Sequence, residues 1–427
     1  MANVRELVLK GLYRIEKEGA YLNQALLDIL SEDLDARDKG FASELMGGVV
    51  RNRLKLDYII EKFSKIKLKK LSPWVHQILR IGIYQIINME RVPDSAACNE
   101  SVKLARKYAH GAAQGYINGL LRAVAREKKN IEYPKRTLER LSVLYSYPLW
   151  LTEKLISQYG EETCEEILLS SHKKQPVSIR VNSLKANQEK LLTRLKEEGL
   201  DARADAENSK RIYIDGAVNV YSSKAYLDGE YTLQNSSSMT AVEMLSPKEG
   251  EIILDLCAAP GGKTTYMAEC MGNKGKIIAM DIHPHKMELI ENSAKRLGIT
   301  IIETICGDAG EIKEEWINSA DRVLADVPCS GIGVIHKKPD IKWHRYEEDI
   351  QELCKVQKKI LNAASKYVKT GGTLIYSTCT ILKEENQMQI EEFLRENTNF
   401  KLDEEQVLLT HITGGSGFYI AKLVKQG

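Results

Sequence analysis

Asp255-Leu-Cys-Ala-Ala-Pro-Gly-Gly-Lys-Thr264 is the stretch around which the chain is organised. The residues before it, Glu251-Ile-Ile-Leu254, form a short apolar run that predicts a buried strand. After it, Thr264, Thr265 and Met267 can open a helix. A Gly-rich turn between a strand and a helix directs backbone N–H groups at a ligand. We therefore predict a loop that holds a nucleotide-like cofactor.

Two other Gly-rich fingerprints do not match this stretch. A P-loop requires Gly where Cys257 stands, and no Gly-x-Gly-x-x-Gly follows the strand, so ATP and nicotinamide cofactors are disfavoured. Asp281 ends a second apolar run, about 20 to 25 residues beyond the turn, where doubly wound folds place the carboxylate that binds ribose hydroxyls. A third predicted strand, Ile301 to Cys306, leads to Gly307 and Asp308.

Length and composition indicate a globular protein of two or three domains. The chain has 427 residues, of which 43% are hydrophobic and 28% charged. It contains no run of about 18 uncharged apolar residues that would span a bilayer. Arg5, Glu6 and Lys10 interrupt any signal-peptide core near the N-terminus. We expect a cytoplasmic protein with no membrane partner.

The cysteine pattern predicts neither disulfides nor a metal site. The eight cysteines do not occur at the short intervals of a zinc site. They are Cys98, Cys164, Cys257, Cys270, Cys306, Cys329, Cys354 and Cys379.

Residues 1–130 read as a helix bundle. Apolar residues recur at helical spacing, for example Leu22, Leu26, Ile29 and Leu30, and later Val75, Ile78, Leu79, Ile83 and Ile86. Ser72 and Pro73 fit the N-cap and the first turn of the second of these helices. The first 140 residues carry an excess of Lys and Arg, which favours a polyanionic partner, although a solvated helix surface would show the same excess. The natural phosphate contacts are Arg51, Arg53, Lys55, Lys65, Lys67, Lys69 and Lys70.

Residues 131–235 are expected to form a linker and a small α/β domain. The pattern between Ile131 and about Leu144 is irregular and contains Pro134. The predicted elements after it are a helix around 155–170, a strand at 177–181, a helix around 188–198, and strands near Ile212 and Tyr231. Their alternation favours an open sheet with helices on one face.

Residues 236–427 alternate strands and helices as a doubly wound α/β domain does, and two cysteine motifs lie in this region. Asp326-Val-Pro-Cys-Ser-Gly331 and Ser377-Thr-Cys-Thr380 each follow a probable parallel strand. Ligands bind at the carboxyl edge of such a sheet, so Cys329 and Cys379 can converge near the cofactor loop. Taken singly, either cysteine would more often be a small buried hydrophobic residue.

The loop and the two cysteine motifs closely resemble those of the two-cysteine RNA cytosine-C5 methyltransferases. The resemblance implies a Rossmann-like domain that uses S-adenosylmethionine, with Cys379 as nucleophile and Cys329 as the cysteine needed for product release. DNA cytosine methyltransferases instead attack from the Pro-Cys motif, and the intact second motif favours Cys379. Asp326 is the candidate acid at N3 of the cytosine. The predicted cofactor-binding residues are Cys257, Ala258, Ala259, Pro260, Gly261, Gly262, Lys263, Asp281, Asp308 and Asp326.

Other segments extend the resemblance to the whole chain. Ala36 to Leu45, Ile78 to Tyr84 and Gly115 to Arg122 resemble the RNA-binding domain of NusB-type antitermination factors. The arrangement resembles the bacterial 16S ribosomal RNA enzymes of the family, which implies that the target is the cytosine conventionally numbered 967. We expect a monomer, although the sequence does not reveal the oligomeric state. A related enzyme with another ribosomal or transfer RNA target, and a non-catalytic RNA chaperone or antitermination factor, are the alternatives.

Some positions depart from the family pattern or carry weaker expectations. Asn235 and Ser416 stand where Asp is common in the family, so we assign neither a charged role. Arg345 or His344 could hold phosphates of the flipped nucleotide, whereas His336 and Lys337 read equally well as plain loop residues.

Overall fold

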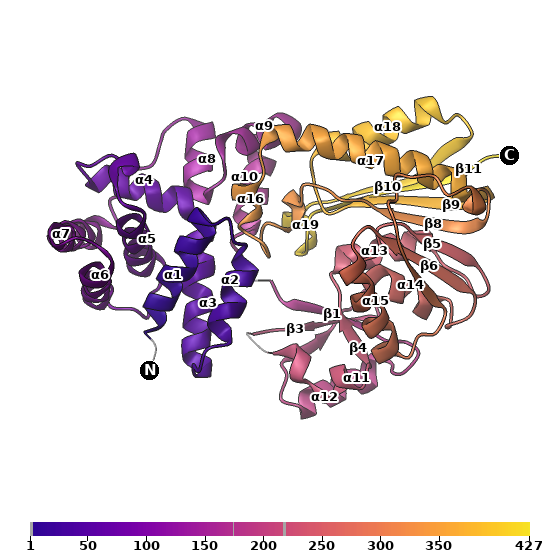
Figure 1. The fold of residues 1–427 in the computed structure, drawn as a ribbon, viewed down its shortest axis with the longest axis horizontal. Helices are drawn as coiled ribbons and strands as arrows, with labels where there is room; N and C mark the ends of the chain where they lie inside the picture. The colour runs from indigo at the N-terminus through magenta and orange to yellow at the C-terminus, as the bar shows by residue number, and fades with distance from the viewer. Residues whose placement is uncertain (1–2, 174, 217–218) are drawn as a thin grey trace. The chain divides into compact units, whose positions relative to one another are not determined.

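The computed structural model describes residues 3–173, 175–216 and 219–427, and these divide into two units (Figure 1). The first unit is helical and contains the chain up to His172 together with residues 335–344. The second contains residues from Lys173 to Val334 and from Arg345 to Gly427. It combines a small antiparallel sheet with a larger, mostly parallel one.

The helical unit is built from amphipathic helices whose apolar stripes face a common core. Its helices are α1 (Val4–Lys17), α2 (Leu22–Leu30), α3 (Ala36–Arg51), α4 (Arg53–Phe63), α5 (Pro73–Asn88), α6 (Asp94–Tyr108), α7 (Gly111–Glu127), α8 (Thr137–Tyr145), α9 (Leu149–Tyr159), α10 (Glu161–Ser170) and α16 (Ile341–His344), with the short 3-10 helix η1 (Leu68–Lys70). The bundle predicted for residues 1–130 is therefore confirmed.

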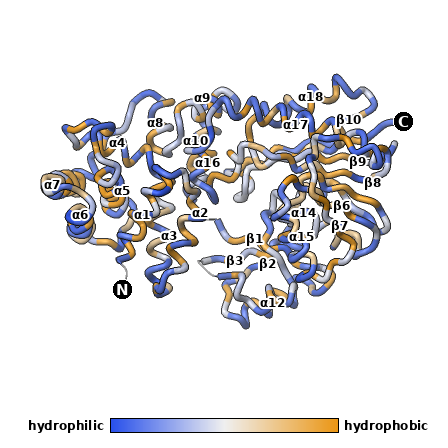
Figure 2. The backbone as a smooth tube through the Cα atoms, in the orientation of Figure 1, coloured by the Kyte–Doolittle hydropathy of each residue, from blue (hydrophilic) through white to orange (hydrophobic). Residues whose placement is uncertain are grey.

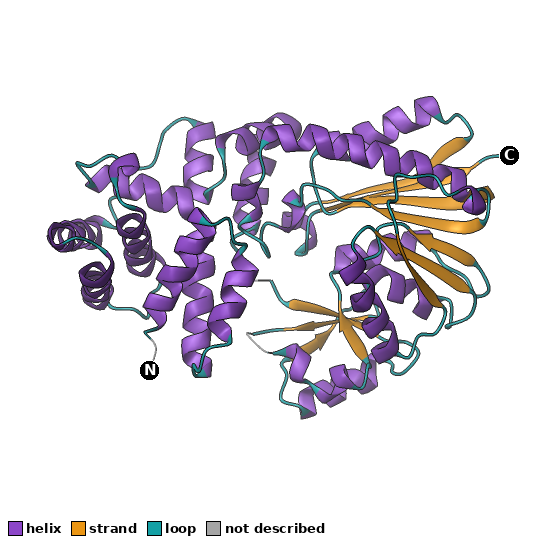
Figure 3. Ribbon diagram, in the orientation of Figure 1, coloured by secondary structure: helices purple, strands orange, loops and turns teal. Residues whose placement is uncertain are grey.

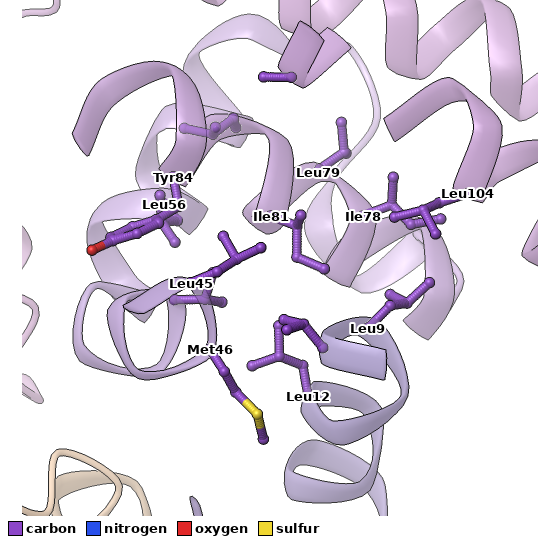
Figure 4. Close-up of a cluster of buried hydrophobic side chains, with 14 of the residues drawn as sticks. Leu9, Leu12, Leu45, Met46, Leu56, Ile78, Leu79, Ile81, Tyr84 and Leu104 are labelled. Atoms are coloured by element: carbon purple, nitrogen blue, oxygen red, sulfur yellow. The ribbon is translucent and has the colours of Figure 1, made fainter. Parts of the chain in front are cut away.

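Helix α5 lies in the middle of this core and is buried around most of its circumference. Leu9 of α1, Leu45 of α3 and Ile78 of α5 belong to one buried cluster (Figure 4). Gly48 allows close packing here, because a Cβ atom would lie within about 2 Å of the Tyr84 ring. Ser72 accepts a hydrogen bond from the Val75 backbone N–H at 3.3 Å, which confirms the predicted N-cap.

The helical unit extends further along the chain than the sequence indicated. Helices α8, α9 and α10 belong to it, although the sequence pattern placed residues 131–170 in a linker and the small domain. The single helix expected around 155–170 is two helices, because Gly160 adopts a positive φ of 82° between them. Irregular apolar spacing hid α8, whose buried side consists of Leu141 and Ser142.

Residues 335–344 complete the helical unit by capping two of its helices. Asp340 accepts a hydrogen bond from the Leu22 N–H, 2.8 Å away, at the first turn of α2. Lys342 and Trp343 donate to the carbonyl oxygens of Arg51 and Val50 at the end of α3. An acidic side chain thus lies at a helix N-terminus, as the helix dipole favours, whereas burial lowers the pKa of Lys342 well below its ordinary value and its amine caps α3 as a hydrogen-bond donor.

The second unit begins with the small domain, whose four strands pair in the order β2-β3-β1-β4. Its elements are β1 (Val177–Val181), α11 (Gln188–Glu197), β2 (Ala202–Ala204), β3 (Arg211–Ile214), η2 (Val220–Ser222), α12 (Lys224–Leu227) and β4 (Tyr231–Leu233). The described strand pairs are antiparallel. Ile179, Leu191 and Ile212 contribute to the core between this sheet and α11. The strands and the helix predicted here are confirmed, with boundaries shifted by a residue or so.

The larger sheet has seven strands in the order β10-β11-β9-β8-β5-β6-β7. Strands β5 to β9 run parallel, and β10 and β11 are added antiparallel at one edge. The strands are β5 (Ile252–Asp255), β6 (Lys276–Asp281), β7 (Ile302–Cys306), β8 (Ala320–Asp326), β9 (Val368–Thr378), β10 (Phe400–Leu408) and β11 (Phe418–Lys425). The predicted doubly wound, Rossmann-like domain is confirmed.

Helices cover both faces of this sheet (Figure 3). The helices and short 3-10 helices of this domain are α13 (Ser236–Leu245), α14 (Gly262–Cys270), α15 (Pro284–Leu297), η3 (Glu314–Trp316), η4 (Ile332–Val334), α17 (Glu347–Tyr367), η5 (Lys383–Glu385), α18 (Gln387–Glu396) and α19 (Thr410–Thr413). Leu254 packs in the cluster with residues of α17 and α18, whereas Ile253 packs in the cluster with α13 and α14. Successive strand residues are therefore buried on opposite faces, which explains the continuous apolar runs of the central strands (Figure 2).

Candidate active site

The candidate residues lie at the carboxyl ends of adjacent parallel strands. Strand β5 ends at Asp255, β6 at Asp281 and β8 at Asp326. Asp326 is opposite Ser377 in the pairing of β8 with β9, and the two cysteines follow these residues. The topology thus brings the cofactor loop and both cysteine motifs to one edge of the sheet.

The cofactor loop is held in a turn that requires glycine. Gly261 has a φ of 96°, and a Cβ atom there would lie 3.2 Å from the Cα of Ile290. Helix α14 begins at Gly262, two residues earlier than predicted, because Gly261 already serves as its N-cap. The Ala258 N–H donates to the carbonyl of Met280 at 2.8 Å, which ties the loop to the end of β6.

The carboxylates beyond the loop line the same edge. Asp281 is 8% exposed and accepts hydrogen bonds from the backbone N–H groups of Ala259 (3.3 Å) and His283 (3.1 Å). Asp308 is exposed and accepts from the Gly310 N–H at 2.8 Å. Ile282, directly after Asp281, leaves its side chain 56% exposed and offers an apolar surface for a ring.

Asp255 lies beneath the loop and carries a buried oxygen with no protein partner. Its Oδ2 accepts from the Thr264 hydroxyl at 2.7 Å, and its Oδ1 has no partner among the described residues. Burial raises the pKa of this carboxyl group to about 7. An orphaned buried acceptor, a ribose-type acid and an exposed apolar side chain at one edge fit the polar and aromatic parts of S-adenosylmethionine.

The two motif cysteines face each other. The sulfur atoms of Cys329 and Cys379 are 3.2 Å apart, and both residues are half-buried. The hydrogen bond from the Cys329 thiol lowers the pKa of Cys379, and the Lys263 ammonium lowers it further. The same contact with Cys379, together with burial, raises the pKa of Cys329. The geometry therefore favours Cys379 as the thiolate and Cys329 as the thiol.

Asp326 joins the cofactor loop to the second cysteine motif. Its Oδ2 lies 2.5 Å from the Lys263 Nζ, and its Oδ1 accepts a hydrogen bond from the Ser377 hydroxyl at 2.7 Å. Lys263 also lies 5.1 Å above the ring of Phe418. Sequence reasoning missed Ser377 as a partner, although its register opposite Asp326 follows from parallel pairing of the two motif strands.

Arg180 of the small domain supports the cofactor loop from behind and is fully buried. It donates to the carbonyl of Gly262 (2.7 Å), to the hydroxyl of Thr265 (3.0 Å) and to both carboxylate oxygens of Glu269 (2.7 and 3.1 Å). Four bonds from one guanidinium thus fix the first two turns of α14. The sequence pattern placed Arg180 only within the strand predicted at 177–181.

The two positions that depart from the family pattern contact each other. The side-chain amide of Asn235 donates to the Ser416 hydroxyl, and Asn235 also caps α13 through the Ser237 N–H. The Ser237 hydroxyl donates to the carbonyl of Ser416 at 2.7 Å. A neutral amide and a neutral hydroxyl therefore form one structural pair, which agrees with assigning neither position a charged role.

The weaker candidates are divided between the units. Arg345 reaches back to the carbonyl of Ser330 at 3.4 Å, next to Cys329. His344 stacks on Tyr21 in the helical unit, with ring centroids 5.0 Å apart. Burial lowers the pKa of His336 to about 4, so this side chain is neutral at physiological pH.

The basic residues of the helical unit fall into two groups. Arg51, Arg53 and Lys55 are half-buried and contact the His336 carbonyl, the Trp343 ring and the Tyr133 ring, respectively. The lysines of the later run, in contrast, are exposed: Lys65, Lys67, Lys69 and Lys70. The exposed run is the better candidate for phosphate contacts.

Two kinds of site are absent from the part of the chain that the structure describes. No group of three or more His, Cys, Asp or Glu side chains is arranged to hold a metal ion among residues 3–173, 175–216 and 219–427. Within the same ranges, no helix is both long and apolar enough to cross a membrane.

Comparison with family models defines the class of protein. Residues 242–424 match the model of the 16S rRNA methyltransferase RsmB/F, residues 2–126 the NusB family, and residues 147–221 the ferredoxin-like domain of RsmF/B-like methyltransferases. Among solved structures, PH0851 superposes with a TM-score of 0.82 at 29% identity and covers 100% of this chain and 99% of its own. NSun6 from Pyrococcus horikoshii with SFG has a TM-score of 0.62 at 26% identity, over 66% of this chain and 100% of its own. These matches place the chain in the class of rRNA methyltransferases.

Full-length relatives narrow the class to one family. The chain is 36% identical to the probable ribosomal RNA small subunit methyltransferase B of Bacillus subtilis, covering 100% of this chain and 99% of the relative. It is 33% identical to ribosomal RNA small subunit methyltransferase B of Proteus mirabilis, with 99% of both chains covered. The chain therefore belongs to the ribosomal RNA small subunit methyltransferase B family.

Proposed function

We propose that this protein transfers a methyl group from S-adenosylmethionine to C5 of a cytosine in 16S ribosomal RNA, through a covalent bond between Cys379 and C6. The observation that carries this proposal is the pair of facing thiols, 3.2 Å apart, beside the Lys263–Asp326 ion pair. Two thiols and one acid–base pair are the groups that this reaction needs.

Attack by a thiolate makes cytosine reactive. C5 is too weak a nucleophile to accept a methyl group unaided, but a bond from sulfur to C6 moves electron density onto C5 and N3. The nucleophile must be ionised, and the lowered pKa of Cys379 favours its thiolate at neutral pH. The target base must leave its stack to reach the site, at a cost of a few kcal/mol.

The developing negative charge at N3 requires a proton donor. We assign this role to Asp326, whose carboxylate shares a hydrogen bond with the Lys263 ammonium at 2.5 Å. Lys263 can supply the proton that Asp326 passes to N3, and the Ser377 hydroxyl keeps the carboxylate oriented. When N3 is later deprotonated, the proton returns along the same path.

Release of the product reverses the addition. A base removes the proton from C5, the C5–H electron pair restores the C5–C6 double bond, and Cys379 leaves as a thiolate. We assign this step to Cys329, which faces Cys379 at 3.2 Å: it first loses its own proton to solvent, and its thiolate then takes the proton from C5, directly or through water. Once Cys379 is bound to C6 it carries no charge, which removes a cause that raises the pKa of Cys329.

The residues that would hold the methyl donor line the strand ends. S-adenosylmethionine, when bound, supplies an electrophilic methyl group. Asp281 would bind its ribose hydroxyls, Asp308 its adenine edge, and the loop from Cys257 to Lys263 its amino acid part. The orphaned Oδ1 of Asp255 is available to accept a hydrogen bond from an ammonium group.

The RNA target follows from the family. Its members named above act on the small ribosomal subunit by their printed names, and the family resemblance of the sequence points to cytosine 967 and a monomeric enzyme. The helical unit would dock the RNA through its exposed lysines.

The proposal is tested by incubating the protein with labelled S-adenosylmethionine and 16S RNA, followed by nucleoside analysis. Label in 5-methylcytosine at one position of 16S RNA is expected. Label that appears only in transfer RNA or another ribosomal RNA would identify a related enzyme with a different target. Tight RNA binding without any label would identify a non-catalytic RNA chaperone or antitermination factor.

A further inference from the structure

A buried carboxylate lies between the two cysteine motifs. Glu385 ends the 3-10 helix η5 and is fully buried. Its Oε2 accepts from the Ser330 backbone N–H (2.8 Å) and from the Gln357 amide (2.9 Å), and its Oε1 accepts from the Ser330 hydroxyl (2.5 Å). Burial raises the pKa of the Glu385 carboxyl, and the three neutral donors oppose this rise because they bond to its ionised form.

This carboxylate fixes the turn that carries Cys329. Ser330 follows Cys329 in the chain, and its hydroxyl lies 2.9 Å from that of Thr380, which follows Cys379. Gln357 bridges Glu385 and the carbonyl of Pro328, the residue before Cys329 (3.0 Å). The residues on both sides of Cys329 are thus held by one network centred on Glu385.

Two further hydrogen bonds, from β9 and from α17, hold the backbone of η5 at Glu385 and Glu384. The Tyr376 hydroxyl donates to the backbone carbonyl of Glu385 at 2.6 Å. The Cys354 thiol donates to the neighbouring carbonyl of Glu384 at 3.3 Å. These contacts hold the backbone of η5, so the Glu385 side chain is directed at the Cys329 turn.

The charges around the two thiols differ. Cys379 has the Lys263 ammonium and the Asp326 carboxylate near it, in addition to Cys329 and Glu385. The anionic groups that raise the pKa of Cys329 are the Cys379 thiolate and Glu385, while the Arg345 guanidinium lies nearby on the Ser330 carbonyl. A second negative charge beside Cys329 opposes its ionisation, whereas the hydrogen bond from Cys329, with a smaller contribution from Lys263, lowers the pKa of Cys379.

We propose that Glu385 is a positioning residue that holds Cys329 against Cys379 and keeps Cys329 in the protonated form, so that only Cys379 is available as the nucleophile. The role of Glu385 in the reaction rests on the proposed function. The electrostatic effect itself is a property of the protein without RNA and can be measured separately.

For the reaction, this proposal predicts that Cys379 attacks first and that Cys329 ionises only afterwards. While Cys379 is free, two negative charges keep the proton on Cys329, which donates its hydrogen bond to the nucleophile. After Cys379 has bonded to C6, one of these charges is gone and Cys329 ionises more readily. Glu385 remains and sets how readily this happens, so it also sets the rate at which the product is released.

The test titrates the Cys329 thiol in the full-length protein with Cys379→Ala, so that one thiol of the pair is left. Alkylation by iodoacetamide is followed against pH, and the Cys329 peptide is quantified by mass spectrometry. Adding Glu385→Gln, which removes the charge at constant size, should move the midpoint to lower pH by roughly 1 unit. Adding Glu391→Gln, an exposed carboxylate on the next helix, should leave it unchanged.

Glu385→Asp provides a second variant, because it keeps the charge but withdraws it by one methylene. Its midpoint should lie between those of the parent and Glu385→Gln. An equal midpoint in all three proteins would overturn the proposal, even if alkylation became faster at every pH, since that result would mean a looser turn and no charge effect. If Glu385→Gln does not fold, as judged by circular dichroism, the Asp variant decides alone.

A kinetic readout separates this inference from the proposed function. With 16S RNA and otherwise unaltered cysteines, Glu385→Gln should change the pH dependence of turnover on its alkaline side, while S-adenosylmethionine affinity stays the same. A midpoint shift in a protein whose wild type makes no 5-methylcytosine would refute the function and leave the electrostatic role intact. An unshifted midpoint in an active methyltransferase would refute the role of Glu385 alone.

Discussion

At the scale of single residues, the surroundings give two identical side chains different pKa values. Cys379 receives a hydrogen bond from Cys329 and lies near Lys263, and these contacts lower its pKa. Cys329 faces a thiolate and the buried Glu385, which raise its pKa. This difference in pKa comes from the neighbouring groups and not from the position in the fold, because both cysteines follow strand ends at the same edge of the sheet.

The ribose-binding role proposed for Asp281 predicts a loss of cofactor affinity in Asp281→Ala. A charge-assisted hydrogen bond is worth roughly 1.5 to 3 kcal/mol, which corresponds to about a tenfold to hundredfold weaker binding of S-adenosylmethionine. Isothermal titration calorimetry measures this affinity directly. Asp403→Ala, on the exposed side of β10, serves as the control and should bind normally. Equal affinities in the two variants would refute the assignment.

Asp255 predicts a specific pH dependence of stability. Its folded-state pKa is raised by burial to about 7, against an ordinary value of 3.8, so between these values the folded protein holds a proton that the unfolded chain has lost. Its contribution to the free energy of unfolding is therefore complete at low pH and falls as pH rises toward 7, by up to about 1.4 kcal/mol per unit.

Asp255→Asn should remove this slope, so that urea unfolding at pH 5, 6 and 7 gives a flatter profile than in the parent protein. Asp321→Asn is a suitable comparison, because the pKa of Asp321 is lowered from 3.8, so its contribution changes only at lower pH and the slope between pH 5 and 7 should match that of the parent. An unchanged difference between pH 5 and pH 7 in Asp255→Asn would show that this carboxyl is ionised in the folded state.

At the scale of elements, the cofactor loop depends on a strand of another domain. Arg180 on β1 and Glu269 on α14 form a fully buried ion pair. Arg180→Met should destabilise the second unit by about 3 to 5 kcal/mol, since it leaves Glu269 charged and unpaired. Denaturant unfolding measures this loss. Arg180→Met with Glu269→Met should recover much of the stability, and a double variant as unstable as the single one would contradict the ion-pair explanation.

The elements that the sequence predicted well are those whose pattern is dictated by burial on two faces. The strands that end at Asp255, Asp281 and Asp326 were recognised because each is a continuous apolar run followed by a polar turn. Helix α8 was missed because its short apolar stripe shows no clear period. Glu385 was missed because it lies in a charged stretch that reads as a solvated helix, and only the fold buries it.

At the scale of the whole molecule, domain assignment depends on contacts that cross the sequence. Residues 335–344 follow the Pro-Cys motif in the chain, yet they cap α2 and α3 of the helical unit. The caps use Asp340 and Lys342, two residues that in the sequence belong to a polar loop. Hydrophobic periodicity carries no information about a late segment that packs against an early part of the chain, so the sequence could not reveal this contact.

The exposed lysines of the helical unit predict a salt-dependent contribution to RNA binding. Each phosphate contact contributes up to about 0.9 to the slope of log affinity against log salt. Replacing Lys65, Lys67, Lys69 and Lys70 by Gln should therefore weaken RNA binding and flatten this slope. The matched control replaces four exposed lysines of the second unit: Lys190, Lys196, Lys248 and Lys274. A slope that falls equally in both variants would place the docking surface elsewhere.

The central claim is that Cys379 attacks the base and Cys329 releases it, and it is tested most directly by trapping the covalent complex. The wild type and the variants Cys329→Ala, Cys379→Ala and the double variant are mixed with S-adenosylmethionine and 16S RNA, then separated by denaturing gel electrophoresis. Cys329→Ala should accumulate a protein–RNA species, because attack and methylation proceed while elimination fails. The two variants that lack Cys379 should form none. A stable species formed by Cys379→Ala in place of Cys329→Ala would exchange the two roles, and retained methylation in both single variants would contradict the two-thiol mechanism.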